Sequence, residues 1–311
     1  MKWAFLYAGQ GSQKVGMGKD FYETYPSYKE YIDSLDVGID IKKLMHEGPL
    51  EELSDTKNTQ ACMAAFAAGV TDILLKEGIT PSYAMGLSLG EYGALYAAGA
   101  FDNTEYVKLT AFRGAAMQKA AEGKSCKMSA VLGLDSDVIK EVCDSYSGDG
   151  YVTVSNYNCK GQTVICGDEQ AVNNVEEILK EKGAKRCIKL NVSGPFHTKY
   201  MASAGDALKE YFEVHPFKNL RIPVMSNATG DFYKAEDSIN ELLIKQVQNS
   251  VRLEENIEKL LDEDIDCFIE IGPGKVVSGF MNKMSKALSK EIKIMSIETV
   301  EDLKKVLEQN Q

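Results

Sequence analysis

The sequence has too little positive charge to bind a polyanion over its surface. Its 35 lysine and arginine residues are outnumbered by 46 aspartate and glutamate residues, which gives a formal net charge of −11. Nucleic acids and anionic membrane surfaces are both bound through basic faces. We therefore expect neither a nucleic acid nor a membrane as a partner.

The cysteines include no Cys-x-x-Cys pair, and their number is odd. That spacing is typical of neither a zinc site nor a disulfide framework. We expect reduced, mostly packed thiols in a cytoplasmic protein, with no metal site. The seven residues are Cys62, Cys126, Cys143, Cys159, Cys166, Cys187 and Cys267.

Long apolar runs are also lacking. The six apolar residues 3–8 are too few for the core of a signal peptide, and no small-residue cleavage site follows them. No run approaches the roughly 20 residues that cross a bilayer as a helix. Residues 3–8 are better explained as a buried first strand.

Strand-like and helical patterns alternate along most of the chain, which predicts an α/β fold with a mainly parallel sheet. The texture changes between residues 125 and 190, where six short elements follow one another in βαββαβ order. That order is the ferredoxin-like pattern. We therefore predict a large α/β subdomain from residues 1–124 and 191–311, with a small ferredoxin-like subdomain inserted at 125–190. The main predicted strands are 3–8, 83–85, 223–226 and 267–271, and the main predicted helices are 60–76 and 106–121.

The stretch Gly86-Leu87-Ser88-Leu89-Gly90 stands between a predicted strand and a predicted helix. Glycines beside the serine allow a turn too tight for side chains, and the serine hydroxyl is left at a helix N-terminus. This context favours a nucleophilic serine over an ordinary tight turn.

A serine nucleophile needs a base, usually a histidine, and the chain has three. His46 lies in a charged helical stretch, where we expect it to be exposed, and His215 precedes a proline in a turn. His197 lies in a loop that leaves a strand and opens a helix, so it is the predicted base. No acid between Ser88 and His197 stands at a convincing strand end. A backbone carbonyl could orient the histidine instead.

Two further features bear on the chemistry. Arg113 lies on the face of a predicted helix that should be buried, where it is either a structural arginine or a bidentate clamp for a carboxylate. The loop at residues 9–13 lacks the spacing of a phosphate-binding loop. Its backbone N–H groups could instead serve an oxyanion.

Together, these segments resemble the malonyl-CoA:acyl carrier protein transacylases of bacterial fatty-acid synthesis. The resemblance rests on Gly-Gln-Gly-Ser-Gln at 9–13, Gly-x-Ser-x-Gly-Glu at 86–91, Phe-Arg-Gly at 112–114, Asn-x-Asn at 156–158, the histidine loop at 194–198 and Gly-Pro-Gly-Lys at 272–275. These motifs occur in family order over nearly the whole chain. Two positions depart from the family pattern, since Leu87 replaces a histidine and Ala61 a proline, and neither change removes a catalytic group.

The resemblance implies a hydrolase-like, three-layer large subdomain and assigns the site residues. Ser88 would be the nucleophile, His197 the base and the backbone carbonyl of Gln246 its orienting partner. The backbone amides of Gln10 and Leu89 would form the oxyanion hole. Substrate contacts would come from Arg113, Asn156, Asn158 and Phe196.

The implied function is transfer of a malonyl group from malonyl-CoA to acyl carrier protein through a malonyl-serine ester, without a cofactor. A stand-alone acyltransferase for a polyketide synthase, a serine carboxylesterase or thioesterase, and a catalytically dead docking scaffold are the alternatives. A monomer is the working expectation. Because carrier proteins are acidic, docking needs a local basic patch, for which we predict Lys182, Lys185, Arg186, Lys189 and Lys199, although a solvated surface explains the same residues nearly as well.

Overall fold

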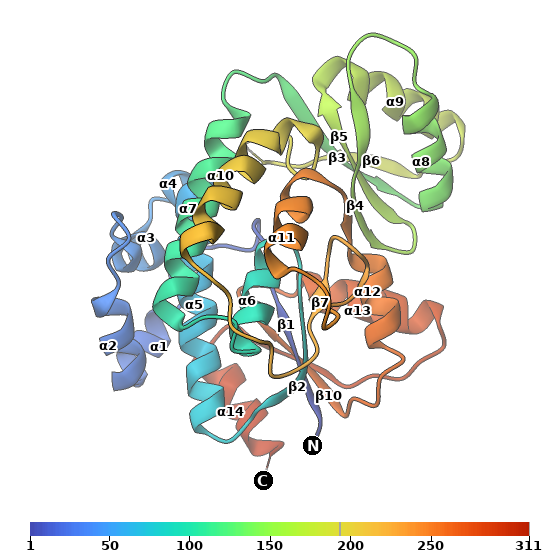
Figure 1. The fold of residues 1–311 in the computed structure, drawn as a ribbon. Coiled ribbons are helices and arrows are strands. Elements are labelled where there is room, and N and C mark those ends of the chain that lie inside the picture. The colour runs from blue at the N-terminus through green and yellow to red at the C-terminus, as the bar shows by residue number, and fades with distance from the viewer. Residues whose placement is uncertain (193, 311) are drawn as a thin grey trace.

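The computed structural model describes residues 1–192 and 194–310, and two sheets organise them (Figure 1). The first sheet has four parallel strands in the order β11-β10-β1-β2. The α/β fold with a mainly parallel sheet is thereby confirmed. These strands are β1 (Trp3–Tyr7), β2 (Pro81–Gly86), β10 (Cys267–Ile271) and β11 (Ile294–Ile297).

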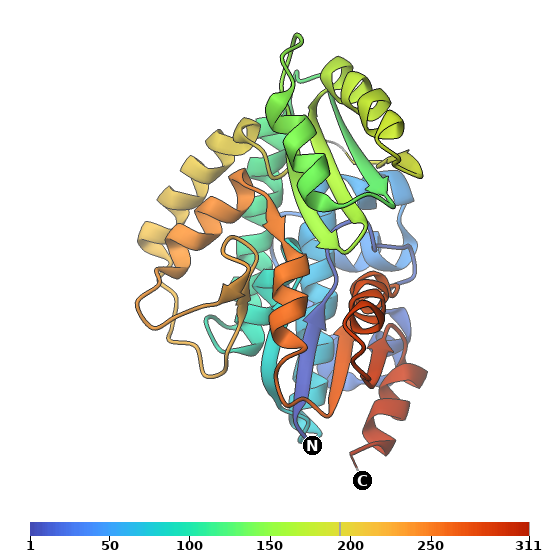
Figure 2. The same cartoon turned by 90° about the vertical axis from the view of Figure 1, so that its right-hand side faces the viewer.

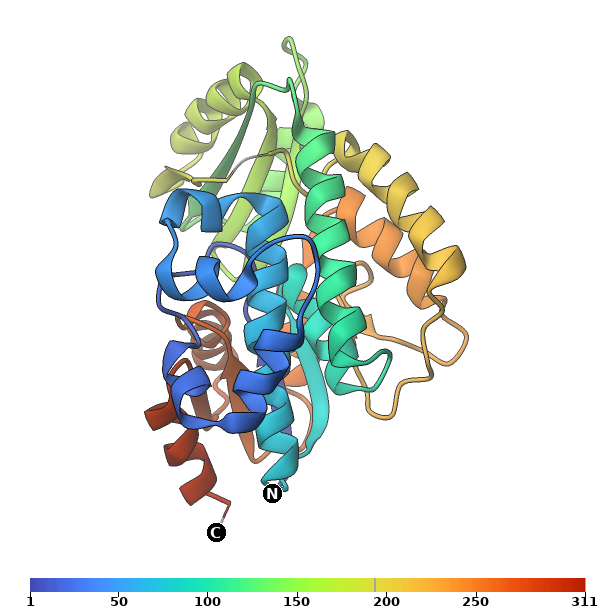
Figure 3. The same ribbon diagram turned by 90° about the vertical axis from the view of Figure 1, so that its left-hand side faces the viewer.

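Both faces of the parallel sheet are buried, which makes it the middle of three layers. On β1, Phe5 and Tyr7 pack into one apolar cluster, whereas Ala4 and Leu6 pack into another. The first cluster is shared with α5, α6, α7 and α10, and the second with α12 and α13 (Figure 2). Figure 3 shows α1 to α4 grouped on the outer side of α5.

The helices around the parallel sheet are α1 (Lys19–Thr24), α2 (Pro26–Ser34), α3 (Ile41–Glu47), α4 (Leu50–Ser54), α5 (Thr56–Lys76), α6 (Leu89–Ala97), α7 (Asn103–Ala121), η1 (Lys199–Met201), α10 (Ala202–Val214), α11 (Ile239–Gln248), α12 (Leu253–Leu260), α13 (Val276–Ala287) and α14 (Val300–Glu308), with a short hairpin of β7 (Met225–Ser226) and β8 (Asp231–Phe232). Within the described ranges, no helix is long and apolar enough to span a membrane.

The second sheet has five strands in the order β6-β3-β5-β4-β9. Its first four strands are antiparallel and come from one continuous segment, in the predicted βαββαβ order. One face packs on α8 and α9, while the other face points Met128, Ala130 and Val164 toward the core of the parallel sheet. The elements are β3 (Cys126–Leu132), α8 (Ser136–Ser145), β4 (Val152–Cys159), β5 (Gln162–Asp168), α9 (Glu169–Glu181), β6 (Arg186–Lys189) and β9 (Val251–Arg252).

Strand β9 lies outside the 125–190 segment, yet it pairs in parallel with β4 through Asn156–Val251 and Tyr157–Arg252. We keep residues 125–190 as the proposed small subdomain. The edge of its sheet is nevertheless completed by a strand from residues 191–311, a pairing that no pattern in the sequence predicted.

Two local expectations were wrong. Helix α5 begins at Thr56 rather than at Gln60, because the polar residues at its start are buried and bonded: the Asn58 amide donates to Glu52 O and the Thr59 hydroxyl to Leu53 O. His46 is half-buried rather than exposed, since its ring meets the Tyr22 ring edge-on at a centroid distance of 5.2 Å. The cysteines are all unpaired, as predicted, and five of them are buried.

Candidate active site

The chain turns sharply at Ser88, between β2 and α6. Ser88 has φ 52° and ψ −99°, a backbone conformation that residues other than glycine rarely adopt. A Cβ atom on Gly86 would lie 1.9 Å from the carbonyl carbon of Gly90, and one on Gly90 would lie 2.2 Å from the Tyr7 carbonyl oxygen, so close packing requires both glycines. The backbone N–H of Ser88 donates to Asn227 Oδ1 at 2.7 Å. These constraints hold the Ser88 hydroxyl at the N-terminus of α6.

His197 is placed against this hydroxyl. The Ser88 Oγ–His197 Nε2 distance is 2.7 Å, and His197 Nδ1 lies 2.8 Å from the backbone carbonyl oxygen of Gln246. A carbonyl oxygen only accepts, so Nδ1 carries the proton and Nε2 is free to accept one from Ser88. The predicted third partner is therefore a carbonyl at the end of α11, and it orients the ring without a charge.

The environment of His197 keeps its imidazole neutral. Burial, followed by the positive charge of Arg113, lowers the His197 pKa to about 4, although the bond to Gln246 opposes this shift. A neutral imidazole at neutral pH is the form that can take a proton from serine.

This shift predicts the pH dependence of acylation. The rate requires the neutral imidazole, so it should stay nearly constant from pH 7 to pH 5 and fall about tenfold per pH unit below pH 4. Single-turnover acylation of Ser88 measured across this range tests the expectation. The variant His215→Gln, which removes a half-exposed histidine paired with Glu105, should leave the profile unchanged. A decline that begins near pH 6.5 would contradict the assignment.

Arg113 lies on α7 and is completely buried, as predicted. Its Nη1 donates to Gln60 Oε1 at 2.7 Å, and its Nη2 donates to Ser88 Oγ at 3.1 Å and to Gln246 Oε1 at 3.0 Å. Its Nε has no hydrogen-bond partner among the described residues, and its guanidinium carbon lies 5.1 Å from the centre of the Tyr92 ring. The guanidinium is therefore held next to the serine and still has N–H groups that are free to donate to a ligand.

These groups open into one cavity of about 280 Å³ between the two sheets. Its described lining is mainly apolar, and Arg113 is the one lining residue with a permanent charge. Among the predicted substrate and oxyanion residues, Gln10, Asn156, Asn158 and Phe196 line it, whereas Leu89 follows the serine as the first residue of α6. The first amides of a helix have no partner within it, which suits the proposed oxyanion role of Leu89.

Four residues that support this constellation were not assigned a role from the sequence. Gln60 bonds both Arg113 and the Gln10 side chain, and Asn227 holds the backbone of Ser88. Glu91 is buried behind Gln246 and accepts a hydrogen bond from the partly buried Tyr233 hydroxyl. Glu91 stood in the matched motif at 86–91, so the signal for it was present.

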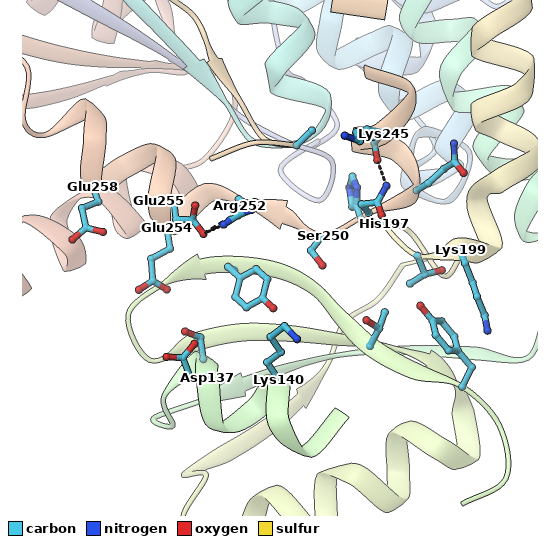
Figure 4. Close-up of a pocket in the computed structure, with 18 residues that line it drawn as sticks. Asp137, Lys140, His197, Lys199, Lys245, Ser250, Arg252, Glu254, Glu255 and Glu258 are labelled. Atoms are coloured by element: carbon cyan, nitrogen blue, oxygen red, sulfur yellow. Dashed lines mark hydrogen bonds and ion pairs between the residues drawn. The ribbon is translucent and has the colours of Figure 1, made fainter. Parts of the chain in front are cut away.

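A second, open groove of about 620 Å³ lies on the other side of His197 (Figure 4). Its four basic residues are matched by four acidic ones, and Arg252 is bonded to Glu255 at 2.6 Å. The groove therefore has no net charge that would select a cation or an anion. The charged residues are Lys140, Lys199, Lys245, Arg252, Asp137, Glu254, Glu255 and Glu258.

The basic residues predicted for docking are all exposed, but they are not one cluster. Lys182, Lys185, Arg186 and Lys189 lie on and just before β6, and Lys189 is 3.7 Å from Glu169. Lys199 lines the groove beside His197 and stacks 3.9 Å above the Tyr151 ring. Of the five predicted residues, only the four on and just before β6 could therefore form one continuous basic patch.

The fold is α/β, a serine stands at a strand–turn–helix elbow, and a histidine from a distant loop is hydrogen-bonded to that serine. Together these features define an enzyme that moves acyl groups. The comparison with known proteins is more specific. Residues 4–307 match the family model of the acyl transferase domain, so the chain belongs to that family and is an acyltransferase.

Relatives and solved structures agree with this assignment. The malonyl CoA-acyl carrier protein transacylase of Bacillus subtilis (strain 168) is 42% identical over 303 residues, which cover 96% of this chain and 95% of the relative. The crystal structure of the transacylase of that name from Clostridium perfringens superposes with a TM-score of 0.94 at 37% identity, covering 100% of this chain and 97% of the other. A third match is to the solved structure of a type II polyketide synthase acyl-carrier protein in complex with its malonyl-transacylase. The matched chain superposes with a TM-score of 0.93 at 31% identity, and the match covers 100% of this chain and 100% of that chain.

Proposed function

We propose that this acyltransferase moves a malonyl group from malonyl-CoA to the phosphopantetheine thiol of an acyl carrier protein, for chain elongation in fatty-acid synthesis. The observation that carries the proposal is that Arg113, the one cation in the described lining of the cavity, lies buried beside the Ser88–His197 pair. A guanidinium with unused donors is suited to a carboxylate, and malonyl-CoA has a carboxylate two bonds from its thioester carbonyl carbon. The names of the relatives support the same substrates.

The first half-reaction forms an ester on Ser88. The hydroxyl proton passes to His197 Nε2 as Oγ attacks the thioester carbonyl, and the amides of Gln10 and Leu89 would stabilise the oxyanion. The tetrahedral intermediate collapses when its C–S bond breaks, and the CoA sulfur takes the proton from His197. In the second half-reaction the carrier thiol gives its proton to His197 and attacks the ester. Ser88 recovers the proton as it leaves.

The scheme needs no prosthetic group, and we propose that the enzyme works as a monomer in the cytoplasm. Reaction in a cavity with a mainly apolar lining would limit attack by water on the ester. A polyketide acyltransferase would use the same groups, and the carrier protein it prefers distinguishes the two.

Intact-protein mass spectrometry tests the proposal. Mixing the enzyme with malonyl-CoA is expected to add one malonyl group, and adding holo-acyl carrier protein is expected to remove it much faster than buffer does. Loss of the adduct at the same rate in buffer alone would identify a hydrolase instead. Absence of both adduct and turnover would identify a catalytically dead scaffold.

Carrier docking gives a separate prediction. The double variant Lys185→Glu/Arg186→Glu reverses two exposed charges beside β6 and is expected to raise the apparent KM for holo-carrier about tenfold, because the carrier is acidic. The KM for malonyl-CoA should not change. Lys304→Glu/Lys305→Glu, which reverses two exposed charges on α14, is the matched control. An unchanged carrier KM in the first variant rejects the patch.

A further inference from the structure

Behind the substrate cavity, Glu91 is a fully buried carboxylate for which the mechanism has no use. Three donors surround it. The Asn227 backbone N–H lies 3.0 Å from Oε2, Gln246 Nε2 lies 2.9 Å from the same oxygen, and the Tyr233 hydroxyl bonds Oε1. Burial raises the pKa of the Glu91 carboxyl, but the bonds from Tyr233, Gln246 and Asn227 and the charge of Arg113 oppose this shift and favour the ionised form. An ionised carboxylate accepts all three bonds, and buried ions persist in proteins when they are paired in this way.

The side chain of Gln246 connects Glu91 to Arg113. Its Nε2 donates to Glu91 and to the Ser88 carbonyl oxygen at 2.9 Å, and its Oε1 accepts from Arg113 Nη2 at 3.0 Å. The acceptors on one side and the donor on the other fix the orientation of this amide. Hydrogen bonds in such a chain polarise one another, so the negative charge of Glu91 is felt at the guanidinium.

The arrangement sets the charge of the site. With His197 neutral, the buried charges are one cation, Arg113, and one anion, Glu91. They cancel in the empty enzyme, so the site carries one net negative charge when the substrate carboxylate is bound. Without Glu91 the empty site would be positive and would attract any small carboxylate more strongly.

We propose that Glu91 is a positioning residue that acts through Gln246 and Arg113 to weaken the hold on the substrate carboxylate, so that the acyl group is both accepted and released. This inference rests on the proposed function, in which Arg113 binds the malonyl carboxylate. Glu91 thereby determines how tightly a carboxylated acyl group binds, while Arg113 determines that it binds.

The test compares Glu91→Gln, which keeps the shape and removes the charge, with Glu270→Gln. Glu270 is another fully buried carboxylate, bonded to two backbone N–H groups at the start of α13 and absent from the cavity lining. Free malonate is the probe, and its Kd is measured by calorimetry on the intact enzyme. Glu91→Gln is expected to bind malonate about tenfold more tightly, because one buried negative charge is removed at short range. Its KM for malonyl-CoA should fall in parallel, with no fall for acetyl-CoA, and Glu270→Gln should match the wild type.

An unchanged or weaker malonate affinity in Glu91→Gln would overturn the inference, since it would leave Glu91 only the role of holding Arg113 in place. If Glu91→Gln does not fold, Gln246→Met tests the connection instead. It keeps the backbone carbonyl that orients His197 and removes the side-chain amide that links Glu91 to Arg113. It is expected to bind malonate about tenfold more tightly than the wild type, whereas unchanged or weaker binding would overturn the inference. Failure of the wild type to prefer malonyl-CoA over acetyl-CoA would instead reject the proposed function.

Discussion

Ser88→Ala is expected to abolish the covalent malonyl adduct and to lower malonyl transfer by about 10⁴-fold or more, the scale on which removal of a nucleophile acts. The reason is geometric. The Ser88 hydroxyl is the group within hydrogen-bond distance of both His197 Nε2 and Arg113 Nη2, at 2.7 and 3.1 Å. The measurements are intact mass after mixing with malonyl-CoA and the rate of malonyl transfer to holo-carrier.

Ser285→Ala is the control for that experiment. Ser285 is a buried serine on α13 whose hydroxyl donates to the Asn282 carbonyl, outside the cavity lining. It should form the adduct at the wild-type rate. Adduct formation by Ser88→Ala at that rate would place the nucleophile elsewhere and undo the proposed mechanism.

Arg113→Ala is expected to reduce the preference for malonyl-CoA over acetyl-CoA by roughly 10- to 100-fold, which corresponds to about 1.5–3 kcal/mol of lost charge-assisted hydrogen bonding. Arg113→Lys keeps the charge but loses the planar fork, so it should retain only part of the preference. The measurement is kcat/KM for both thioesters in each variant, with a thermal melt to show that each is folded. Equal preference in Arg113→Ala and the wild type would make Arg113 a structural residue.

The sequence was sufficient to predict most of the architecture, because its elements are bounded by strong local signals. Strand β10 has the bounds that apolar patterning indicated. The turn at Ser88 was predictable because glycines flank the serine between a predicted strand and a predicted helix, and few other residues fit so tight a turn. Arg113 was predicted to be buried from its helical spacing, yet whether it had a substrate role could not be decided from spacing alone.

What could not be predicted depends on contacts between distant segments. Asn227 lies 139 residues from Ser88, and the amide of Gln246 is oriented by Glu91 across 155 residues. The sequence around Asn227 and around Gln246 contains no local pattern that indicates which residue each one contacts. The pairing of β9 with β4 is equally non-local, and a two-residue strand has no periodicity to detect.

That pairing limits how the enzyme can be recombined with its relatives. If residues 125–190 were replaced by the same segment of another acyltransferase, β4 would come from the donor enzyme and β9 from this one. The edge of β4 would then pair with a strand that did not evolve with it. Gln246, whose carbonyl orients His197, lies only five residues before β9. The exchangeable module is therefore discontinuous, and a chimera that respects it must carry Val251 and Arg252 along with the insert.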